Sequence, residues 1–385
     1  MVNLRGLGII SRMDQLMRKI IHYLLIHVMV LGVHFPGDKE VMKGVELFYN
    51  YQTAEAVEIL AQARKNFPEN PRAHFTWAAA RMLDSEAHNP VIESYDLLEG
   101  DLNEIIPILK YLSDSHSDVP EYDLYLGSAI GLKARINLGK KEWVSTLVNA
   151  YRGFQIIRRI EREYPDLMDA KLPIGIVEYF SGLNPGLVQW TAKLIGLEAT
   201  RQAGLEKIEL AVSEGEFANV EAKKIITFLS LWVENDIKTA LRHSDDLHRD
   251  FPKNYFFTIM YLESMIKSGK KDRVLNLFSK LERELEFLTP IQREWYKSYL
   301  DYEKSQYYFH NSEFEKALHY VDLSIDEYHA ELDIILSHAL LLKGKLYDIK
   351  HEREKAIFLY KKCVKLDNYS SAIDEATTYL KHRYK

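Results

Sequence analysis

The residues with the clearest potential for chemistry lie together in one polar stretch, at His243, Asp245, Asp246 and His248. Imidazole and carboxylate groups are ligands that proteins offer to zinc, and they also act as general acids and bases. The stretch belongs to a predicted helix that must also pack through Leu247. We therefore expect these four side chains to form an exposed polar helix face, with a metal site as the alternative.

The known catalytic and cofactor-binding motifs are incomplete in this sequence. His351 and Glu352 begin a zinc-type motif, but the second histidine one helical turn later is missing. Ser181 does not stand in a Gly-x-Ser-x-Gly nucleophile elbow. No glycine-rich loop ends in the Gly-Lys-Ser/Thr sequence that holds phosphates. We therefore expect a non-catalytic protein without a metal or a cofactor.

Two further side chains of reactive type fit a packing role better. His338 lies in an apolar helical run, where a histidine is most often a hydrogen-bonded member of the core. Cys363 is the single cysteine, which excludes an internal disulfide and a cysteine metal cluster. It occupies a small-residue position of the repeat described below, so we expect it to be buried.

The composition is that of a globular helical protein with an acidic balance. Of the 385 residues, 47% are hydrophobic and 28% are charged, which is ordinary globular usage. Alternating β-branched runs are missing, and 18 glycines and 11 prolines are few, so we expect an all-α fold. The formal net charge of −6 argues against nucleic-acid binding, which needs a basic surface that releases counterions from phosphates.

The stretch 44–71 contains the unit that the rest of the chain repeats. It predicts two short helices whose facing positions are Gly44, Leu47, Ala56, Leu60 and Ala63. Intervals of three and four residues keep these side chains on one face of each helix, and the small ones let the two helix axes approach closely. Pro68 then stops the second helix, because proline lacks the backbone donor and disfavours helical geometry in the residue before it.

The same spacing returns four more times. Two copies are clear: Gly344, Tyr347, Ala356, Tyr360 and Cys363, and Ser305, Tyr308, Ala317, Val321 and Ser324. Two are less regular: Leu262, Met265, Val274, Phe278 and Leu281, and Phe228, Leu231, Ala240, Ser244 and Leu247. The spacing resembles the tetratricopeptide repeat (TPR), a helix–turn–helix unit of about 34 residues. The resemblance implies an α-solenoid of stacked antiparallel helix pairs and does not identify a partner.

The first 35 residues differ from everything later. Their net charge of +3 comes from Arg5, Arg12, Asp14, Arg18 and Lys19. An apolar run at 20–33 follows directly, which is the arrangement of a secretory signal and is shorter than the ~20 residues that span a bilayer. Gly32 is the best candidate for a cleavage site, and Met13 is an alternative start. We expect export to a periplasmic or other extracytoplasmic compartment; the alternatives are an uncleaved membrane anchor or a first packed helix in a cytoplasmic protein.

Aromatic–proline pairs mark the ends of helix pairs, at Phe67-Pro68, Tyr164-Pro165 and Phe251-Pro252. Together with the repeat spacing they divide the chain into four predicted parts. These are a signal or anchor at 1–35, N-terminal TPR-like repeats at 36–170, an atypical helical hairpin at 171–216 and C-terminal TPR-like repeats at 217–385.

The atypical part contains a strong turn signal at Asn184-Pro185-Gly186, followed by an apolar helical face that includes Trp190. The order Asn-Pro-Gly-Leu, Trp, Gly-Leu, Arg-Gln-Ala-Gly-Leu-Glu resembles the central block of the TPR group that includes repeat-39 and Iml2-like proteins. Ala199-Thr200 stands where that group has Gly-Asp. We expect a hairpin that bends the solenoid and buries Trp190, with contact to a partner or a membrane surface as the alternative.

These observations predict a scaffold that binds an extended or helical segment of another protein on the concave face of the solenoid. The expected contact residues are Tyr49, Arg81, Lys133, Trp190, Lys304 and Tyr308. The alternative is a carrier of an apolar small molecule or lipid within the superhelix. A polar binding face would favour the scaffold, whereas a closed apolar cavity would favour the carrier. Peripheral association with a membrane is compatible with either.

Overall fold

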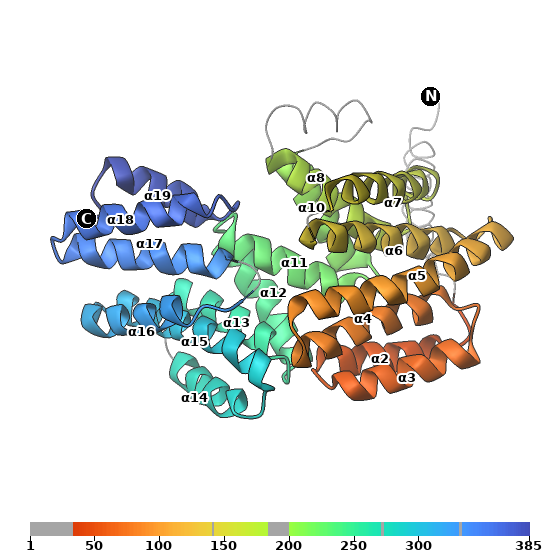
Figure 1. Cartoon of the computed structure of the whole chain (residues 1–385), viewed down its shortest axis with the longest axis horizontal. Coiled ribbons are helices and arrows are strands. Elements are labelled where there is room, and N and C mark those ends of the chain that lie inside the picture. Colours follow the sequence, from red (N-terminus) through yellow and green to blue (C-terminus); the bar gives the residue numbers. More distant parts are fainter. Residues whose placement is uncertain (1–33, 141, 184–199, 271–272, 331–332) are drawn as a thin grey trace, which may run out of the picture. The chain divides into compact units, whose positions relative to one another are not determined.

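A computed structural model describes residues 34–140, 142–183, 200–270, 273–330 and 333–385. The segment Phe35–Lys385 forms one compact unit. Every regular element in the described ranges is a helix, and no β-strand occurs in them (Figure 1). The expected all-α class is confirmed.

The helices follow one another as packed neighbours. The N-terminal helices are α2 (Asp38–Tyr49), α3 (Thr53–Asn66), α4 (Pro71–His88), α5 (Val91–Ser115), α6 (Pro120–Gly139) and α7 (Trp143–Glu163). The middle part contains the 3-10 turn η1 (Met168–Ala170), α8 (Lys171–Leu183) and α10 (Arg201–Glu214). The C-terminal helices are α11 (Asn219–Trp232), α12 (Ile237–Asp250), α13 (Tyr255–Lys267), α14 (Val274–Leu285), α15 (Pro290–His310), α16 (Phe314–Asp326), α17 (Ile334–Ile349), α18 (Arg353–Lys365) and α19 (Ser371–Lys381). Alternate helices such as α13, α15 and α17 also touch, which is the stacking of a solenoid.

The turn inside each helix pair is the most regular feature of the chain. In the first pair Tyr51 has a left-handed backbone with φ of 60°, and the N–H groups of Tyr51 and Gln52 donate to the carbonyls of Phe48 and Leu47. This is a Schellman motif, which satisfies the last carbonyls of a helix. The residue at the same frame position is also left-handed in the other four copies, at Asn235, Gly269, Ser312 and His351. The five copies predicted from spacing are therefore five equivalent turns.

Small residues bring the two helices of a pair together. A Cβ atom added to Gly44 would overlap the side chain of Leu60, and one added to Gly344 would overlap the ring of Tyr360. The frame alanines Ala56, Ala63, Ala317 and Ala356 are buried, and so is Cys363; Tyr347 is half-buried and Pro68 is exposed. The close approach predicted from the small residues is confirmed.

The aromatic–proline pairs end helices as expected. Helices α3, α7 and α12 stop at Asn66, Glu163 and Asp250, each directly before the aromatic residue. The next helix starts with an asparagine cap in two of these cases, because the side chains of Asn70 and Asn254 accept backbone N–H groups of the first turn.

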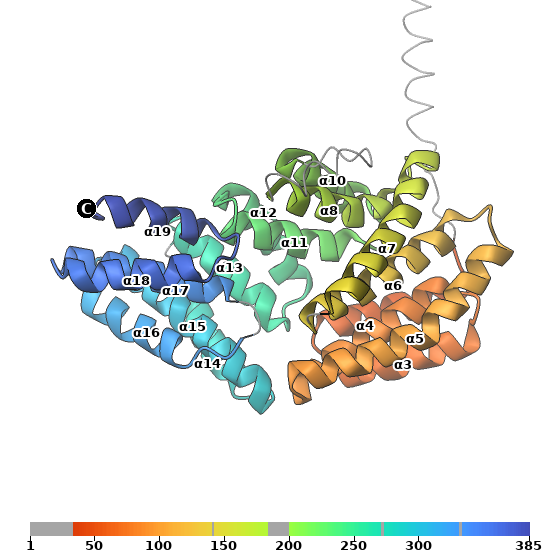
Figure 2. The same cartoon turned by 45° about the horizontal axis from the view of Figure 1, so that its top comes forward.

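The first helix pair also packs on the C-terminal helices. The side-chain amide of Asn254 donates to the carbonyl of Tyr49 at 2.8 Å, although 205 residues separate them. The ring of Tyr49 stacks near that of Phe257 in a core that includes Trp232. Helix α4 contacts α15 as well (Figure 2). Core contacts therefore cross the expected boundary between the N-terminal and C-terminal repeats.

None of the described helices combines the length and the apolar character needed to cross a membrane. The apolar run at 20–33 and the Asn184-Pro185-Gly186 turn lie outside the described residues. Export of the protein stays a prediction.

Candidate functional site

Two of the expected contact residues meet on helix α5. The Nε atom of Arg81 in α4 donates to Oδ2 of Asp101 at 2.8 Å, and Nζ of Lys133 in α6 donates to Oδ1 of Asn103. Arg64 of α3 forms an ion pair with Glu104 on the same helix. The short segment 101–104 of α5 thus collects cationic side chains from α3, α4 and α6.

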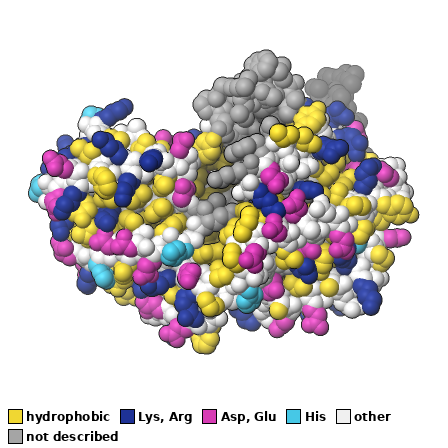
Figure 3. Space-filling view, viewed as in Figure 1, with side chains coloured by type: hydrophobic (Ala, Val, Ile, Leu, Met, Phe, Trp, Pro, Cys, Tyr) yellow, Lys and Arg dark blue, Asp and Glu magenta, His cyan; other side chains and the backbone are white. Residues whose placement is uncertain are grey.

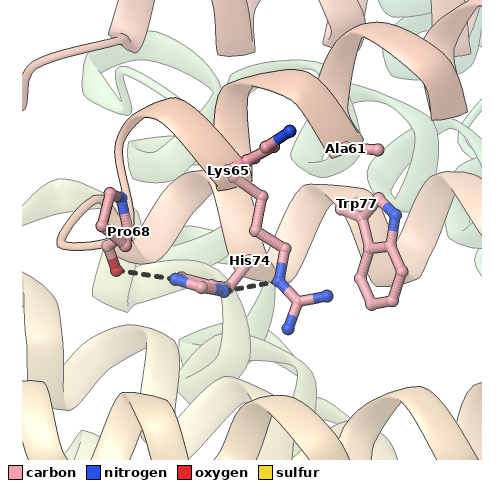
Figure 4. A pocket seen from close by; sticks show the side chains of 6 residues that line it. Ala61, Lys65, Pro68, His74 and Trp77 are labelled. Atoms are coloured by element: carbon pink, nitrogen blue, oxygen red, sulfur yellow. Dashed lines mark hydrogen bonds between the residues drawn. The ribbon is translucent and has the colours of Figure 1, made fainter.

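A pocket of about 340 Å³ lies beside these residues, between α3 and α4 (Figure 4). Its lining consists of Ala61, Arg64, Lys65, Pro68, His74 and Trp77. The guanidinium carbon of Arg64 is 4.2 Å from the centre of the Trp77 ring, a cation–π contact. Lys65 is exposed and forms no ion pair with any described residue. The pocket therefore presents an aromatic wall, a fixed guanidinium and an uncommitted ammonium.

His74 holds Arg64 in this position. Its Nε2 atom lies 2.8 Å from the carbonyl oxygen of Pro68, and Nε of Arg64 donates to its Nδ1 atom at 2.8 Å, as the dashed lines in Figure 4 show. A carbonyl only accepts, so the proton is on Nε2 and Nδ1 is the acceptor. Burial lowers the pKa of His74, in agreement with a neutral ring.

Lys304 and Tyr308 of α15 form a second surface together with α16. The Nζ atom of Lys304 lies 2.8 Å from a carboxylate oxygen of Glu282 and 5.1 Å from the centre of the Tyr320 ring. Tyr308 stacks on the same ring, with centroids 5.5 Å apart and planes inclined by 9°. Tyr320, which the sequence analysis did not single out, therefore joins the two expected residues.

Tyr49 is buried, although it was expected to be an exposed contact residue. It is 9% exposed, and its hydroxyl group donates to Oε2 of Glu221 in α11 at 3.4 Å. Burial raises the pKa of Tyr49 well above its usual value. The ring fills the space between α2 and the C-terminal helices, so it offers little surface to a partner. Trp190 lies outside the described residues.

The polar stretch at 243–248 is divided between the core and the surface. His243 is 3% exposed and faces Glu209 of α10, with Nε2 3.0 Å from the carboxylate, and Nδ1 of His248 lies 3.0 Å from the hydroxyl of Thr258 in α13. The prediction of an exposed polar face is therefore wrong for His243, because its ring points towards the neighbouring helix α10. Among the described residues no group of three or more His, Cys, Asp or Glu could hold a metal ion.

A buried polar network joins α11, α13, α15 and α17. The indole of Trp232 donates to Glu263 at 2.6 Å, Nζ of Lys267 lies 2.7 Å from the other oxygen of that carboxylate, and Nε2 of His338 donates to the Trp232 carbonyl at 3.1 Å. Burial and the charge of Glu263 raise the pKa of Glu303 well above its usual value. The expected core position of His338 is confirmed, and burial lowers its pKa to about 3. Only Glu263, which lies inside an apolar run, could have indicated this network from sequence.

No protein-family model matches this sequence, and a search of curated proteins finds no match either. Similar solved structures include yeast Tom70, at 13% identity and a TM-score of 0.36 over 89% of this chain and 87% of that one. A tetratricopeptide repeat protein from Parabacteroides merdae has 12% identity and a TM-score of 0.31 over 90% and 99%. Human IFIT1 with PPP-AAAA has 12% identity and a TM-score of 0.38 over 86% and 73%. The likeness concerns the helical-repeat fold alone, and the repeat-39 and Iml2-like group is not among these three.

Proposed function

We propose that this protein is a non-catalytic scaffold that binds a segment of a partner protein. The observation that carries the proposal is the open pocket at Trp77, whose lining includes Arg64, Lys65 and His74. A carrier of an apolar molecule needs an enclosed apolar cavity instead. Stacked helix pairs supply a rigid support for such a pocket, since the residues that line it come from two packed helices and the turn between them.

The pocket fits a partner segment that places an acidic side chain beside an aromatic or aliphatic one. The ammonium group of Lys65 is not paired with a carboxylate of the described ranges and can pair with one of a ligand, while the Trp77 ring supplies apolar contact. Arg64 is already held by Trp77 and His74, so little side-chain freedom is lost when a ligand binds to it.

The test uses the 385-residue chain and a set of short fluorescein-labelled peptides in which the acidic and the aromatic residue are varied together and separately. Fluorescence anisotropy measures binding to the wild type and to Lys65→Glu. We expect the peptides that contain both residues to bind best, and Lys65→Glu to weaken them by about tenfold, because a favourable charge contact becomes a repulsive one.

Lys365→Glu is the matched control. Lys365 has the same frame position in the last helix pair and is exposed, but Val364 and Thr377 stand there in place of Arg64 and Trp77. We expect no loss of binding for this variant. Equal losses of peptide affinity in both variants would mean that Lys65→Glu acts through the net charge of the protein and not through the pocket. If no peptide binds and denaturation releases an organic molecule that mass spectrometry detects, the carrier is the correct function.

A further inference from the structure

The outer face of helix α7 carries an exposed apolar stripe. Val144, Val148 and Tyr151 are 77%, 48% and 58% exposed. Their spacing of four and three residues places them on one side of the helix. Large apolar side chains that are exposed together in this way mark interaction surfaces more often than ordinary solvent-facing positions.

The same face becomes basic towards the end of the helix. Its cationic residues are Arg152, Arg158, Arg159 and Arg162. Arg159 pairs with Asp123 and Arg162 with Glu163, whereas Arg152 and Arg158 form no ion pair with any described residue. In Figure 3 hydrophobic side chains lie beside Lys and Arg side chains over α7. One half of the face is therefore apolar and the other half is cationic.

Within the described ranges, helix α7 packs on the next helix over only part of its length. Helices α3, α5, α12 and α16 each pack closely against the next helix along the chain. Helix α7 meets η1 and α8 through its C-terminal half, where Phe154, Ile157 and Ile160 join Ala170 and Ile174 in one core cluster. The N-terminal half keeps the kind of surface on which this fold ordinarily stacks another helix.

We propose that this face of α7 binds a helix of a partner protein that has an acidic N-terminal half and an apolar C-terminal half. An antiparallel helix with this pattern sets its acidic residues over Arg152 and Arg158 and its apolar residues over Val144, Val148 and Tyr151. Acidic residues near a helix N-terminus are also favoured by the helix dipole. A second copy of the chain is a poorer occupant, because antiparallel pairing of two α7 helices would place arginines over valines. This site is separate from the pocket at Trp77 and does not depend on it.

A cysteine at Val148 tests whether the face is free in the native 385-residue chain. The single natural cysteine, Cys363, is buried, so a maleimide reagent should label native Val148→Cys quickly and the wild type slowly. Protection of the new thiol in the native variant would mean that another part of the chain already covers this face, and the proposal would be wrong.

Synthetic helical peptides of identical length test the partner chemistry. One has an acidic half followed by an apolar half, the second has lysines in place of the acidic residues, and the third has the acidic pattern in reverse order. We expect the first to bind the wild type best, and the double variant Arg152→Glu/Arg158→Glu to weaken it by about tenfold and to favour the lysine peptide instead. Lys65→Glu should leave these affinities unchanged, which separates this site from the proposed pocket.

Two results would overturn the proposal. One is equal binding of the acidic and the lysine peptide to the wild type. The other is binding of phosphatidylserine vesicles that the double arginine variant abolishes while no peptide binds, since the face would then recognise an anionic lipid surface. Melting curves of the variants should match the wild type, because Arg152 and Arg158 form no ion pair with the described part of the chain.

Discussion

The hydroxyl group of Tyr51 lies 2.6 Å from the hydroxyl group of Tyr296, a residue 245 positions further along the chain. Tyr51 is the left-handed residue of the first turn, and Tyr296 belongs to α15. Burial raises the pKa of Tyr51 to about 12. This bond and the contacts of Tyr49 make the first helix pair part of the packing of the C-terminal repeats.

Tyr51→Phe and Tyr296→Phe should each lower the free energy of unfolding by about 1 kcal/mol, because each removes the hydrogen bond between the two hydroxyl groups. The double variant should lower the free energy of unfolding by no more than either single change does. The coupling energy between the two residues is then also about 1 kcal/mol. Urea unfolding measures all three, and Tyr111→Phe, at a position that is 70% exposed, serves as the control. Strictly additive losses would show that the two hydroxyl groups do not interact in solution.

Gly344→Ala and Gly100→Ala should change stability in opposite directions. A methyl group at Gly344 overlaps the Tyr360 ring, so the helix pair must separate slightly, at a cost of about 1–3 kcal/mol. Gly100 lies inside α5 with nothing near its added methyl group, and alanine there should gain about 0.5–1 kcal/mol from helix propensity. Thermal unfolding distinguishes the two variants. An unchanged stability of Gly344→Ala would mean that the two helices of the pair can accommodate a methyl group at this position.

Ser312→Gly should stabilise the protein by about 1 kcal/mol. Ser312 is exposed and has a φ of 60°, a conformation that costs an L-residue roughly this amount and glycine almost nothing. Ser312→Ala is the matched control and should give no gain, since alanine keeps the Cβ atom. Denaturant midpoints that move equally for both variants would contradict a backbone origin.

Asp301 should make the protein less stable at neutral pH than at mildly acidic pH. Burial raises the pKa of this carboxyl group from 3.8 to about 6, and its Oδ2 atom has no hydrogen-bond partner. The pKa of Asp301 is higher in the folded state than in the unfolded state. Burial of the ionised carboxylate therefore destabilises the protein fully above pH 6, and this destabilisation disappears as the pH falls to about 4.

Asp301→Asn therefore should raise the free energy of unfolding at pH 8 by on the order of 1–3 kcal/mol. This advantage should shrink as the pH falls from 6 to 4. Asp118→Asn, at an exposed loop position, controls for the removal of one negative charge. An advantage of Asp301→Asn that stays constant over this range would exclude titration as its cause.

The sequence was informative wherever structure depends on residues that are close along the chain. The spacing from Gly44 to Ala63, the stop at Phe67-Pro68 and the burial of Cys363 follow from helical periodicity and backbone chemistry, which act locally. The spacing did not identify the α6–α7 pair as a copy of the repeat, because the polar Asn137 stands at the position that Leu47 has in the first pair. The N–H group of Glu142 nevertheless donates to the Asn137 carbonyl at 2.8 Å, just as that of Gln52 donates to the Leu47 carbonyl.

Features that join distant segments were not predictable in this way. Nothing near Tyr49 in sequence indicates that the side chain of Asn254 donates a hydrogen bond to its carbonyl. The partner of the buried His243, Glu209, likewise comes from another helix. The position of Arg81 at the candidate site likewise depends on Asp101 of α5. Helix periodicity identifies which face of a helix is apolar, but not which other helix will cover it.

The contact between the first turn and α15 also affects how the protein is made. Repeats that touch only their neighbours can fold in order as they leave the ribosome. Here the partners of Tyr49 and Tyr51 follow 205 and 245 residues later, so the first helix pair cannot finish folding until most of the chain has been synthesised. During that interval the side chains of Tyr49 and Tyr51 lack these partners, and we expect the nascent first pair to be prone to aggregation if translation stalls before α15.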